Sequence, residues 1–245
     1  MMSSHMATFS LLGFEPQNSD AAAAAIEEAE KRLGLSLPLS VRDWYLRQDA
    51  IKILAEHSNN DPPIPIEEFT LTNWQSHRLL PFRNENQGVC TWAIDLNRAD
   101  DPAVYVDVDT NGKEWQLLAS SFSQYVYSCV WDYRRVFGQP ALVEAQNCAL
   151  SPAALKTLTA LFRQETQTHG WPGSTQYRFF KDGQAILIWS SERQADWFVG
   201  ASSAETLECA LVRVWDIDEV GKSFYDCSKV GREVLKKISS KTPLT

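Results

Sequence analysis

Apolar and polar positions in residues 21–33 alternate with the period of an α-helix. Small and apolar side chains recur three or four residues apart, while charged side chains fill the other side. Ser19 or Asp20 can cap the start of this helix, and Gly34 can end it in a left-handed conformation. A second helix is expected over residues 38–55 without a break, and it begins with a proline in its first turn, where the missing N–H costs nothing.

Three prolines within residues 59–65 exclude regular structure there, because each removes a donor and disfavours the helical conformation in the preceding residue. We therefore expect an exposed loop. Beyond it, runs rich in β-branched and aromatic residues predict four strands. These strands cover residues 78–82, 89–95, 103–107 and 114–118. The last two are joined by a segment whose Asn111-Gly112 pair is a strong hairpin signal. A helix capped by Ser121 follows and ends at Gly138.

The second half of the chain repeats the coarse order of helix, strands and helix, although no aligned residue pattern supports a duplication. Ser151 and Pro152 provide the cap and the first position of its first helix. Strands are then expected at residues 176–180, 185–189, 196–201 and 207–215, and a last helix at about 229–238. The predicted organisation is a domain at residues 7–137, a linker at 138–150 and a C-terminal α+β unit at 151–245.

The composition is that of a globular protein. Apolar residues make up 44% of the chain, and 27 aromatic side chains are available for a core. The 31 acidic and 23 basic side chains give a net charge of −8, which opposes binding to a nucleic-acid backbone and favours a basic protein partner. The longest apolar runs are far shorter than the roughly 20 residues that a membrane helix needs, so no membrane role is predicted.

The cysteines indicate a reducing compartment. They are odd in number, widely spaced and without a CxxC pair, so reduced thiols that pack in the fold are expected. The five are Cys90, Cys129, Cys148, Cys209 and Cys227. Residues 1–6 lack the charged and apolar regions of a secretory signal; they resemble the remnant of an expression tag and are set aside. We therefore predict a cytoplasmic protein.

No motif for common catalytic chemistry occurs. The sequence lacks GxSxG, GxxxxGK[ST] and GxGxxG, the starting points for a nucleophile elbow and for phosphate binding. None of the four histidines has metal-ligand spacing. They are His5, His57, His77 and His169. We expect no enzyme activity, no cofactor and no metal, and we keep an enzyme site in the unassigned C-terminal half as a lesser alternative.

A set of acidic residues is the sharpest local feature of the sequence. Its members are Asp95, Asp100, Asp101, Asp107 and Asp109. Three interpretations stay open. The carboxylates can bond to backbone groups in turns or form the polar face of a strand; Asp107 and Asp109, on one side of a strand, can bind Ca²⁺ or Mg²⁺, although EF-hand spacing is absent; or the set can form a docking patch for a basic protein.

Two further features are candidates for partner contact. Trp74 and Trp171 are flanked by turns, so either can act as an exposed interface anchor. The Pro-rich segment 61–68 combines stiffness with two glutamates, and a rigid loop loses little entropy on binding. The predicted partner-binding residues are Glu67, Glu68, Asp95, Asp100, Asp101, Asp107, Asp109 and Trp74.

Four segments in order resemble the SUKH superfamily. The acidic helix ends in Leu33-Gly34, and Leu-Ser-Leu-Pro-Leu-Ser-Val-Arg-Asp-Trp-Tyr-Leu follows at residues 35–46. This is similar to the family's Leu-Pro-x-Ser/Asp-x-Arg/Lys-x-aromatic signature. Three later segments resemble its central strands and closing helix: residues 79–90, 101–107 and 119–126. The match covers about residues 20–137. It departs where the family usually has an Asn-Gly turn after its second helix: Gln48-Asp49-Ala50 stands there, and the second helix is expected to be longer in this chain.

The resemblance implies an α+β fold with a twisted, mostly antiparallel sheet packed by helices, followed here by the second helix-strands-helix unit. It also implies a non-enzymatic function. Most bacterial members of the family look like immunity proteins of polymorphic toxin systems, which bind and neutralise a cognate toxin, often a nuclease. Fungal relatives look like regulators of cell-wall synthesis and signalling. The expected function is an immunity protein, and the alternative is a regulatory or scaffold protein that binds a cellular partner.

Overall fold

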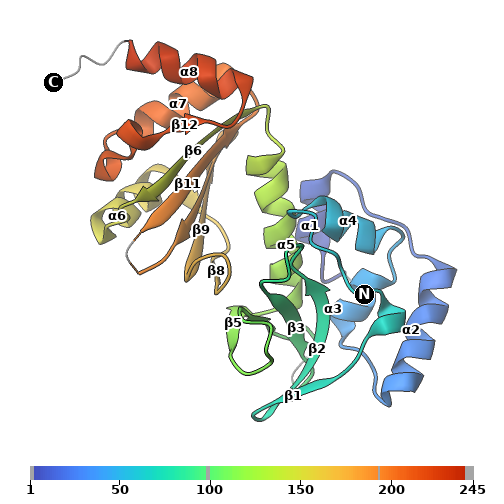
Figure 1. Cartoon of the computed structure of the whole chain (residues 1–245). Coiled ribbons are helices and arrows are strands. Elements are labelled where there is room, and N and C mark those ends of the chain that lie inside the picture. Colours follow the sequence, from blue (N-terminus) through green and yellow to red (C-terminus); the bar gives the residue numbers. More distant parts are fainter. Residues whose placement is uncertain (1–2, 98–99, 193, 241–245) are drawn as a thin grey trace. The chain divides into compact units, whose positions relative to one another are not determined.

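The computed structural model describes residues 3–97, 100–192 and 194–240, which fall into two compact units (Figure 1). Unit 1 consists of Met1–Trp131 and His169–Trp171, and unit 2 consists of Asp132–Thr168 and Pro172–Thr245. Both units combine helices with an antiparallel sheet, so the predicted α+β class is confirmed. No helix among the described residues is long and apolar enough to cross a membrane.

Unit 1 begins with four helices. They are α1 (Met6–Leu12), α2 (Asp20–Leu33), α3 (Leu39–Tyr45) and α4 (Ala50–Glu56). The predicted caps of α2 are confirmed: the Ser19 side chain accepts a hydrogen bond from the Ala22 amide, and Gly34 has a φ of 67°. Ile26 and Ala29 are the buried residues of this helix, and its charged side chains are exposed except that of Glu30, which accepts from the Leu37 amide and pairs with Arg42.

The second predicted helix is divided into α3 and α4, so its expected continuity was wrong. The backbone between them pairs with the segment before α2: Leu46 O accepts from Ser19 N at 2.9 Å, and Gln48 N donates to Gln17 O at 2.7 Å. Asp49 then restarts the helix from a left-handed conformation, with a φ of 60°. Aspartate tolerates this conformation better than most residues, so it can occupy a position otherwise suited to Asn or Gly.

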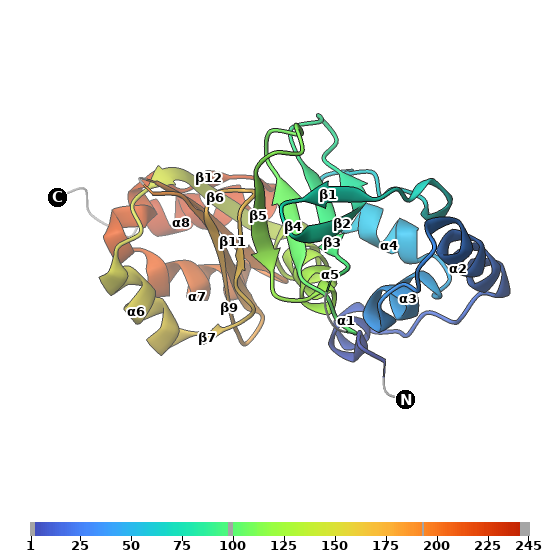
Figure 2. The ribbon, with the colours of Figure 1, turned by 90° about the horizontal axis from the view of Figure 1, so that it is seen from below.

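A five-stranded antiparallel sheet follows in unit 1. Its strands, in sequential order, are β1 (Thr72–Trp74), β2 (His77–Asn84), β3 (Thr91–Asp95), β4 (Val104–Asp107) and β5 (Trp115–Ala119). The four predicted strands are confirmed as β2 to β5, and β1 is an addition. Helices α1 to α4 lie together on one side of this sheet (Figure 2). There, Trp44 and Phe122 pack with strand residues such as Ile94 in one hydrophobic core.

The segment before α1 also contributes to this core through His5, so the interpretation of residues 1–6 as a tag remnant outside the fold was wrong for this residue. Met1 and Met2 lie outside the described residues. His5 is 1% exposed and packs against the rings of Phe9, Trp44 and Phe122. Burial lowers the pKa of His5, so the ring is neutral, and its Nε2 lies 2.9 Å from Ser40 O, to which it can donate.

Unit 2 is built on a second antiparallel sheet, of strand order β12-β6-β11-β10-β9-β7, with β8 paired to β9. Its strands are β6 (Ala141–Cys148), β7 (Arg163–Gln164), β8 (Thr168–His169), β9 (Thr175–Lys181), β10 (Gln184–Ser190), β11 (Ala195–Ala201) and β12 (Tyr225–Asp226). One face packs against α6 (Pro152–Leu161), α7 (Ala204–Val214) and α8 (Lys229–Ser239), which contribute Leu158, Leu211 and Val234 to the core. Ser151 caps α6 through the Ala154 amide, as predicted.

Two sequence predictions in unit 2 were wrong. The expected linker at residues 138–150 is β6, a strand that pairs on both sides; it alternates buried Ala141, Val143 and Ala145 with less buried residues. Because two of these buried residues are alanines, the period-two hydrophobic pattern of the strand is weak in the sequence. The expected strand at residues 207–215 is α7, whose buried residues recur at the three- and four-residue spacing of a helix.

The other face of this sheet is covered by the chain that continues from α5 (Phe122–Asp132) into a π-helical turn, η2 (Tyr133–Phe137). Phe137 contacts Phe198 and Trp189 through their rings. Asp132 forms a two-point ion pair with Arg178, at 2.7 and 2.8 Å. Gly200 lets the backbones approach closely, because a Cβ there would lie 2.7 Å from Val136 Cα and 2.8 Å from Arg135 O.

Gly200→Ala is therefore expected to lower the free energy of unfolding of unit 2 by about 1–3 kcal/mol, the usual cost of overpacking a tight contact. The colliding atoms are backbone, so no side-chain rotation can relieve the clash. Urea unfolding followed by circular dichroism measures the change. Ser202→Ala, at an exposed position of the same segment, is the control and should leave the midpoint unchanged. An unchanged midpoint for Gly200→Ala would contradict the packing of η2 on β11.

Candidate functional site

The structure divides the predicted acidic residues by burial. Asp95 and Asp107 are 2% and 1% exposed, and Asp101 is half-buried. The exposed members are Glu67, Glu68, Asp100 and Asp109. Asp95 and Asp107 therefore cannot form part of an exposed docking patch, which corrects that interpretation for these two residues.

Asp101 caps the N-terminus of α5. Its Oδ1 accepts from the Ser123 amide at 3.0 Å and its Oδ2 from Ser123 Oγ at 2.5 Å. Burial alone would raise the pKa of Asp101, but its hydrogen bonds with Ser123 oppose this effect, and the pKa is lowered. Ser121 itself accepts from the Gln124 amide, as predicted for the helix cap.

The two buried aspartates hold turns at the ends of strands. Asp95 Oδ1 accepts from the Asn97 amide at 3.0 Å, and its Oδ2 lies 2.8 Å from His77 Nδ1. Asp107 Oδ2 accepts from the Gly112 amide at 2.6 Å, which closes the β4–β5 connection. Asp107 Oδ1 is buried and has no hydrogen-bond partner in the described part of the chain. The turn interpretation thus accounts for these carboxylates, except for one oxygen.

A metal site is not formed by these side chains. Across residues 3–97, 100–192 and 194–240, no three His, Cys, Asp or Glu side chains come close enough together to hold a metal ion. The five cysteines are free thiols, as expected. Cys90 and Cys148 are buried, but Cys209 and Cys227 are exposed, so the expected packing role does not hold for these two. Burial raises the pKa of the Cys90 thiol to about 12, so this group is protonated at neutral pH.

Trp74 belongs to a group of rings on the face of the first sheet opposite the helices of unit 1. We call Trp74, His77, Tyr105 and Trp115 the outer-face cluster. Strand register places all four on this face, where they pack over Leu79 and Ala93, apart from the main core. Of the four, only Trp74 was predicted from the sequence. The other three could not be found without the pairing of β1, β2, β4 and β5.

Trp171, the other predicted aromatic anchor, has a different environment. It is half-buried and packs against the core of unit 1. In the same short segment, a Cβ at Gly170 would lie 2.7 Å from Val106 Cγ1. Trp171 is therefore a packing residue in this structure rather than an exposed anchor.

Glu67 and Glu68 lie on a short 3₁₀ turn, η1 (Ile66–Glu68), that is fastened to α2. Arg32 of α2 donates to Phe69 O at 2.6 Å and to Ile66 O at 3.1 Å. Both glutamates are exposed, as predicted, whereas the Pro-rich segment before them is only partly so. Asp61, expected in an exposed loop, is 7% exposed.

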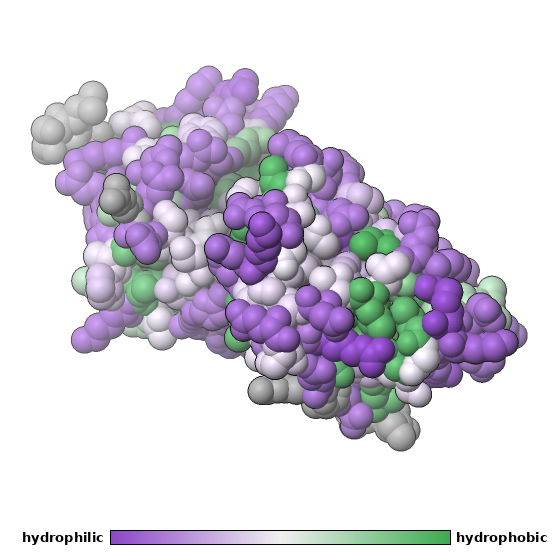
Figure 3. All heavy atoms as spheres, turned by 60° about the horizontal axis from the view of Figure 1, so that its bottom comes forward, coloured by the Kyte–Doolittle hydropathy of each residue, from purple (hydrophilic) through white to green (hydrophobic). Residues whose placement is uncertain are grey.

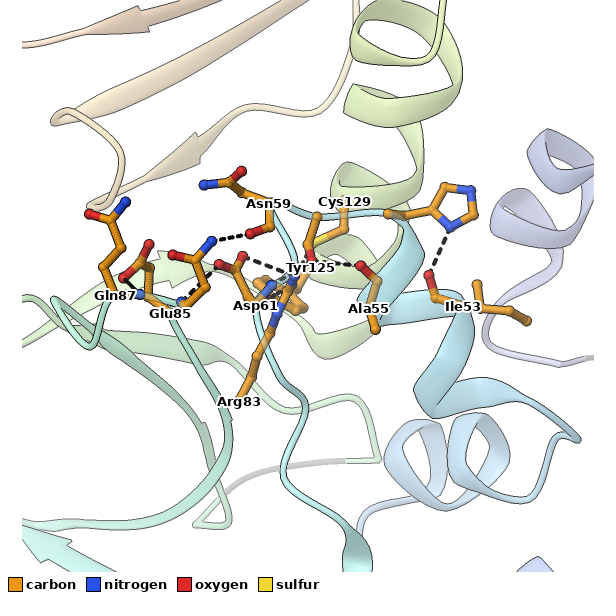
Figure 4. A network of polar contacts seen from close by, with 12 residues as sticks. Ile53, Ala55, Asn59, Asp61, Arg83, Glu85, Gln87, Tyr125 and Cys129 are labelled. Atoms are coloured by element: carbon orange, nitrogen blue, oxygen red, sulfur yellow. Dashed lines mark hydrogen bonds and ion pairs between the residues drawn. The ribbon is translucent and has the colours of Figure 1, made fainter.

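Arg83 explains the burial of Asp61 (Figure 4). Its Nη2 donates to Asp61 Oδ2 at 3.1 Å, its Nη1 donates to Tyr125 Oη at 2.6 Å, and its guanidinium lies over the Trp92 ring. A β-bulge between Pro81 and Arg83 turns this side chain toward the helices, although simple alternation would direct it outward. The network thus ties β2, the Pro-rich loop and α5 together.

The net charge of the chain is concentrated in unit 1. Unit 1 contains 18 acidic and 9 basic residues, a net charge of −9, whereas unit 2 contains 13 and 14, a net charge of +1. Apolar side chains are also exposed on unit 1; they gather in the right-hand part of the face drawn in Figure 3. The large exposed apolar residues of unit 1 are Met6, Phe14, Leu39, Val89 and Leu117. Unit 1 is therefore the better candidate for binding a basic protein.

Arg83→Met is expected to lower the stability of unit 1 by about 3–5 kcal/mol, because it leaves the Asp61 carboxylate buried without its cation. Arg78→Met, at an exposed position on the same strand, should change stability by less than about 0.5 kcal/mol. Chemical unfolding of the two variants checks the difference. Combining Arg83→Met with Asp61→Asn should recover part of the loss. If Arg83→Met unfolds like Arg78→Met, the network is not a main support of unit 1.

Asp101→Asn is expected to cost about 1 kcal/mol of stability at pH 7, the typical value of a helix cap. The folded state holds the pKa of Asp101 below the 3.8 of an unperturbed aspartate. The carboxylate therefore stabilises the fold above that pH and loses its contribution as the pH falls through the folded-state pKa. Unfolding curves at several pH values should show the gap between Asp101→Asn and the parent narrowing in acid. Asp100→Asn, the exposed neighbour, is the control, and a pH-independent gap would contradict the assignment.

Of three comparisons with known proteins, one gave a match, and it lies in the first half of the chain. Comparison with the curated proteins and with the solved structures gave no match. Residues 20–128 match the family model of the SMI1 / KNR4 family (SUKH-1), and this range contains α2 to α4, the whole first sheet and most of α5. No family is assigned to the remainder of the chain. Residues 20–128, somewhat less than half of the chain, are therefore similar to the SUKH superfamily, in agreement with the resemblance of the sequence motifs.

Proposed function

We propose that this chain is an immunity protein that binds a basic toxin domain in the cytoplasm and neutralises it by forming a stoichiometric complex. The observation that carries the proposal is that the family match and the negative net charge fall in the same unit. The family match lies within unit 1, and only unit 1 has a negative net charge, −9 against +1 for unit 2. Similarity to the SUKH superfamily supports a protein partner, and the charge supports a basic one.

The proposed mechanism is binding rather than catalysis. Exposed carboxylates attract a basic surface and speed the encounter, and the bound protein then blocks the toxin's active site. Of the acidic residues predicted from the sequence to bind the partner, four are exposed: Glu67, Glu68, Asp100 and Asp109. Nucleases that bind a phosphate backbone present basic surfaces, so a nuclease domain is the class of toxin that this charge complements best.

The experiment is co-expression with the toxin encoded beside this chain's gene. We expect the parent chain to restore growth and to bind the purified toxin more weakly as salt rises. A charge-reversed variant should associate at least about tenfold more slowly; it carries Lys in place of Glu67, Glu68, Asp100 and Asp109. The control reverses four exposed acids of unit 2 and should behave like the parent. These are Glu192, Glu205, Asp216 and Glu233.

The possible outcomes test the immunity function and the identity of the contact residues separately. Cells that die as readily with the parent chain as without it would exclude the immunity function. Protection that survives in the variant of unit 1, with an unchanged association rate, would remove these four carboxylates as the contact groups. Loss of protection in the unit 2 variant alone would move the binding surface to the second unit.

A further inference from the structure

The outer-face cluster has the form of a preorganised binding surface. The Trp74 and His77 rings are stacked, with centroids 5.3 Å apart and planes at 24°. Tyr105 lies 5.0 Å from His77 and 6.0 Å from Trp74. These three rings are half-buried, so each keeps part of its surface accessible in the described structure. The arrangement therefore offers aromatic surface to a partner, and the rings are already packed against one another.

Hydrogen bonds fix the orientation of two of these rings. Trp74 Nε1 donates to Lys113 O at 2.8 Å, which joins β1 to the β4–β5 connection. His77 Nδ1 lies 2.8 Å from Asp95 Oδ2, and Asp95 is in turn held by the Asn97 amide. A surface whose side chains are already ordered loses little entropy when a partner binds. Such rigid aromatic groups are typical of the residues that dominate binding energy in protein interfaces.

The electrostatics of this face favour a cation. Cross-strand pairing places Asp95 and Asp107 on the same face as the rings, and both carboxylates are buried. Asp107 Oδ2 accepts from the Gly112 amide, whereas its Oδ1 is without a hydrogen-bond partner among the described residues, so the carboxylate is only partly compensated by donors. The faces of aromatic rings are themselves electronegative. Around this surface, unit 1 has a net charge of −9.

We propose that the outer-face cluster binds an arginine side chain presented by a basic protein partner. The planar guanidinium stacks on the accessible parts of the Trp74, His77 and Tyr105 rings, while the Asp95 and Asp107 carboxylates of the same sheet face stabilise its charge. This inference rests on the proposed function, since it names the contact surface of the same complex. Arginine fits better than lysine because a guanidinium can stack on a ring and is less strongly hydrated than an ammonium group.

The probe is an acetylated hexa-arginine peptide, and its binding to the full-length chain is measured by calorimetry at low salt. Hexa-lysine of the same charge is the comparison peptide. We expect hexa-arginine to bind the parent chain more tightly than hexa-lysine does. Trp74→Ala should weaken hexa-arginine binding roughly five- to tenfold, the range expected for loss of a cation–π contact. This variant keeps the net charge, so the loss cannot come from long-range attraction.

Matched variants guard the test against misfolding. Trp189→Ala removes another half-buried Trp, in the nearly neutral unit 2, and should bind like the parent. Trp74→Phe keeps an aromatic ring and should retain binding within about twofold. If Trp74→Ala is poorly folded by circular dichroism, Tyr105→Leu replaces it and should show the same loss.

Equal affinities of Trp74→Ala and the parent, or of hexa-arginine and hexa-lysine, would overturn the proposal. That result would leave the immunity function intact if the parent still protects cells from the toxin. Conversely, specific hexa-arginine binding without protection would support this site and exclude the proposed toxin as the partner.

Discussion

The ion pair between Arg83 and Asp61 holds together parts of unit 1 that are far apart in the sequence. Asp61 lies in a Pro-rich segment that cannot form a full ladder of backbone hydrogen bonds, because its prolines lack donors. Only isolated backbone contacts join it to the sheet, such as Ile64 N to Phe82 O at 2.8 Å. The buried side-chain pair adds an attachment at the start of this segment, and further along the segment Ile64 and Ile66 pack in the core of unit 1.

Burying this ion pair costs desolvation free energy, so its contribution lies more in fixing the strand register than in added stability. Burial raises the pKa of Asp61, and the positive charge of Arg83 opposes that rise. Buried pairs often contribute less stability than apolar side chains of the same size, yet breaking one leaves an uncompensated charge. Arg83 can reach Asp61 and Tyr125 only because the β-bulge turns it inward. The network therefore favours one strand register over its neighbours, in which the charge would be buried alone or face outward.

Local patterns predicted most elements of the fold, and pairing between distant segments explains the rest. Ser19, Ser121 and Ser151 marked helix starts correctly because a cap depends only on residues within one turn. The break between α3 and α4 depends on backbone bonds to residues 17–19, which no local pattern contains. β6 was not predicted because its buried positions are two alanines, a valine and a cysteine in an otherwise mixed segment, and its partner strands lie more than 40 residues away. The outer-face cluster was missed for the same reason, since it exists only after four strands have paired.

The separation of charge between the units changes what the net charge of the chain means. A value of −8 spread over the whole surface would describe a moderately acidic protein, but −9 on unit 1 beside +1 on unit 2 describes one acidic unit with a nearly neutral companion. At physiological salt, charges interact over only about 8 Å, so a partner responds to the unit it approaches rather than to the total. The carboxylates can then attract a basic partner to unit 1, but this attraction does not distinguish one basic protein from another. The rings of the outer-face cluster act at contact distance, where side-chain shape and hydration distinguish one cation from another.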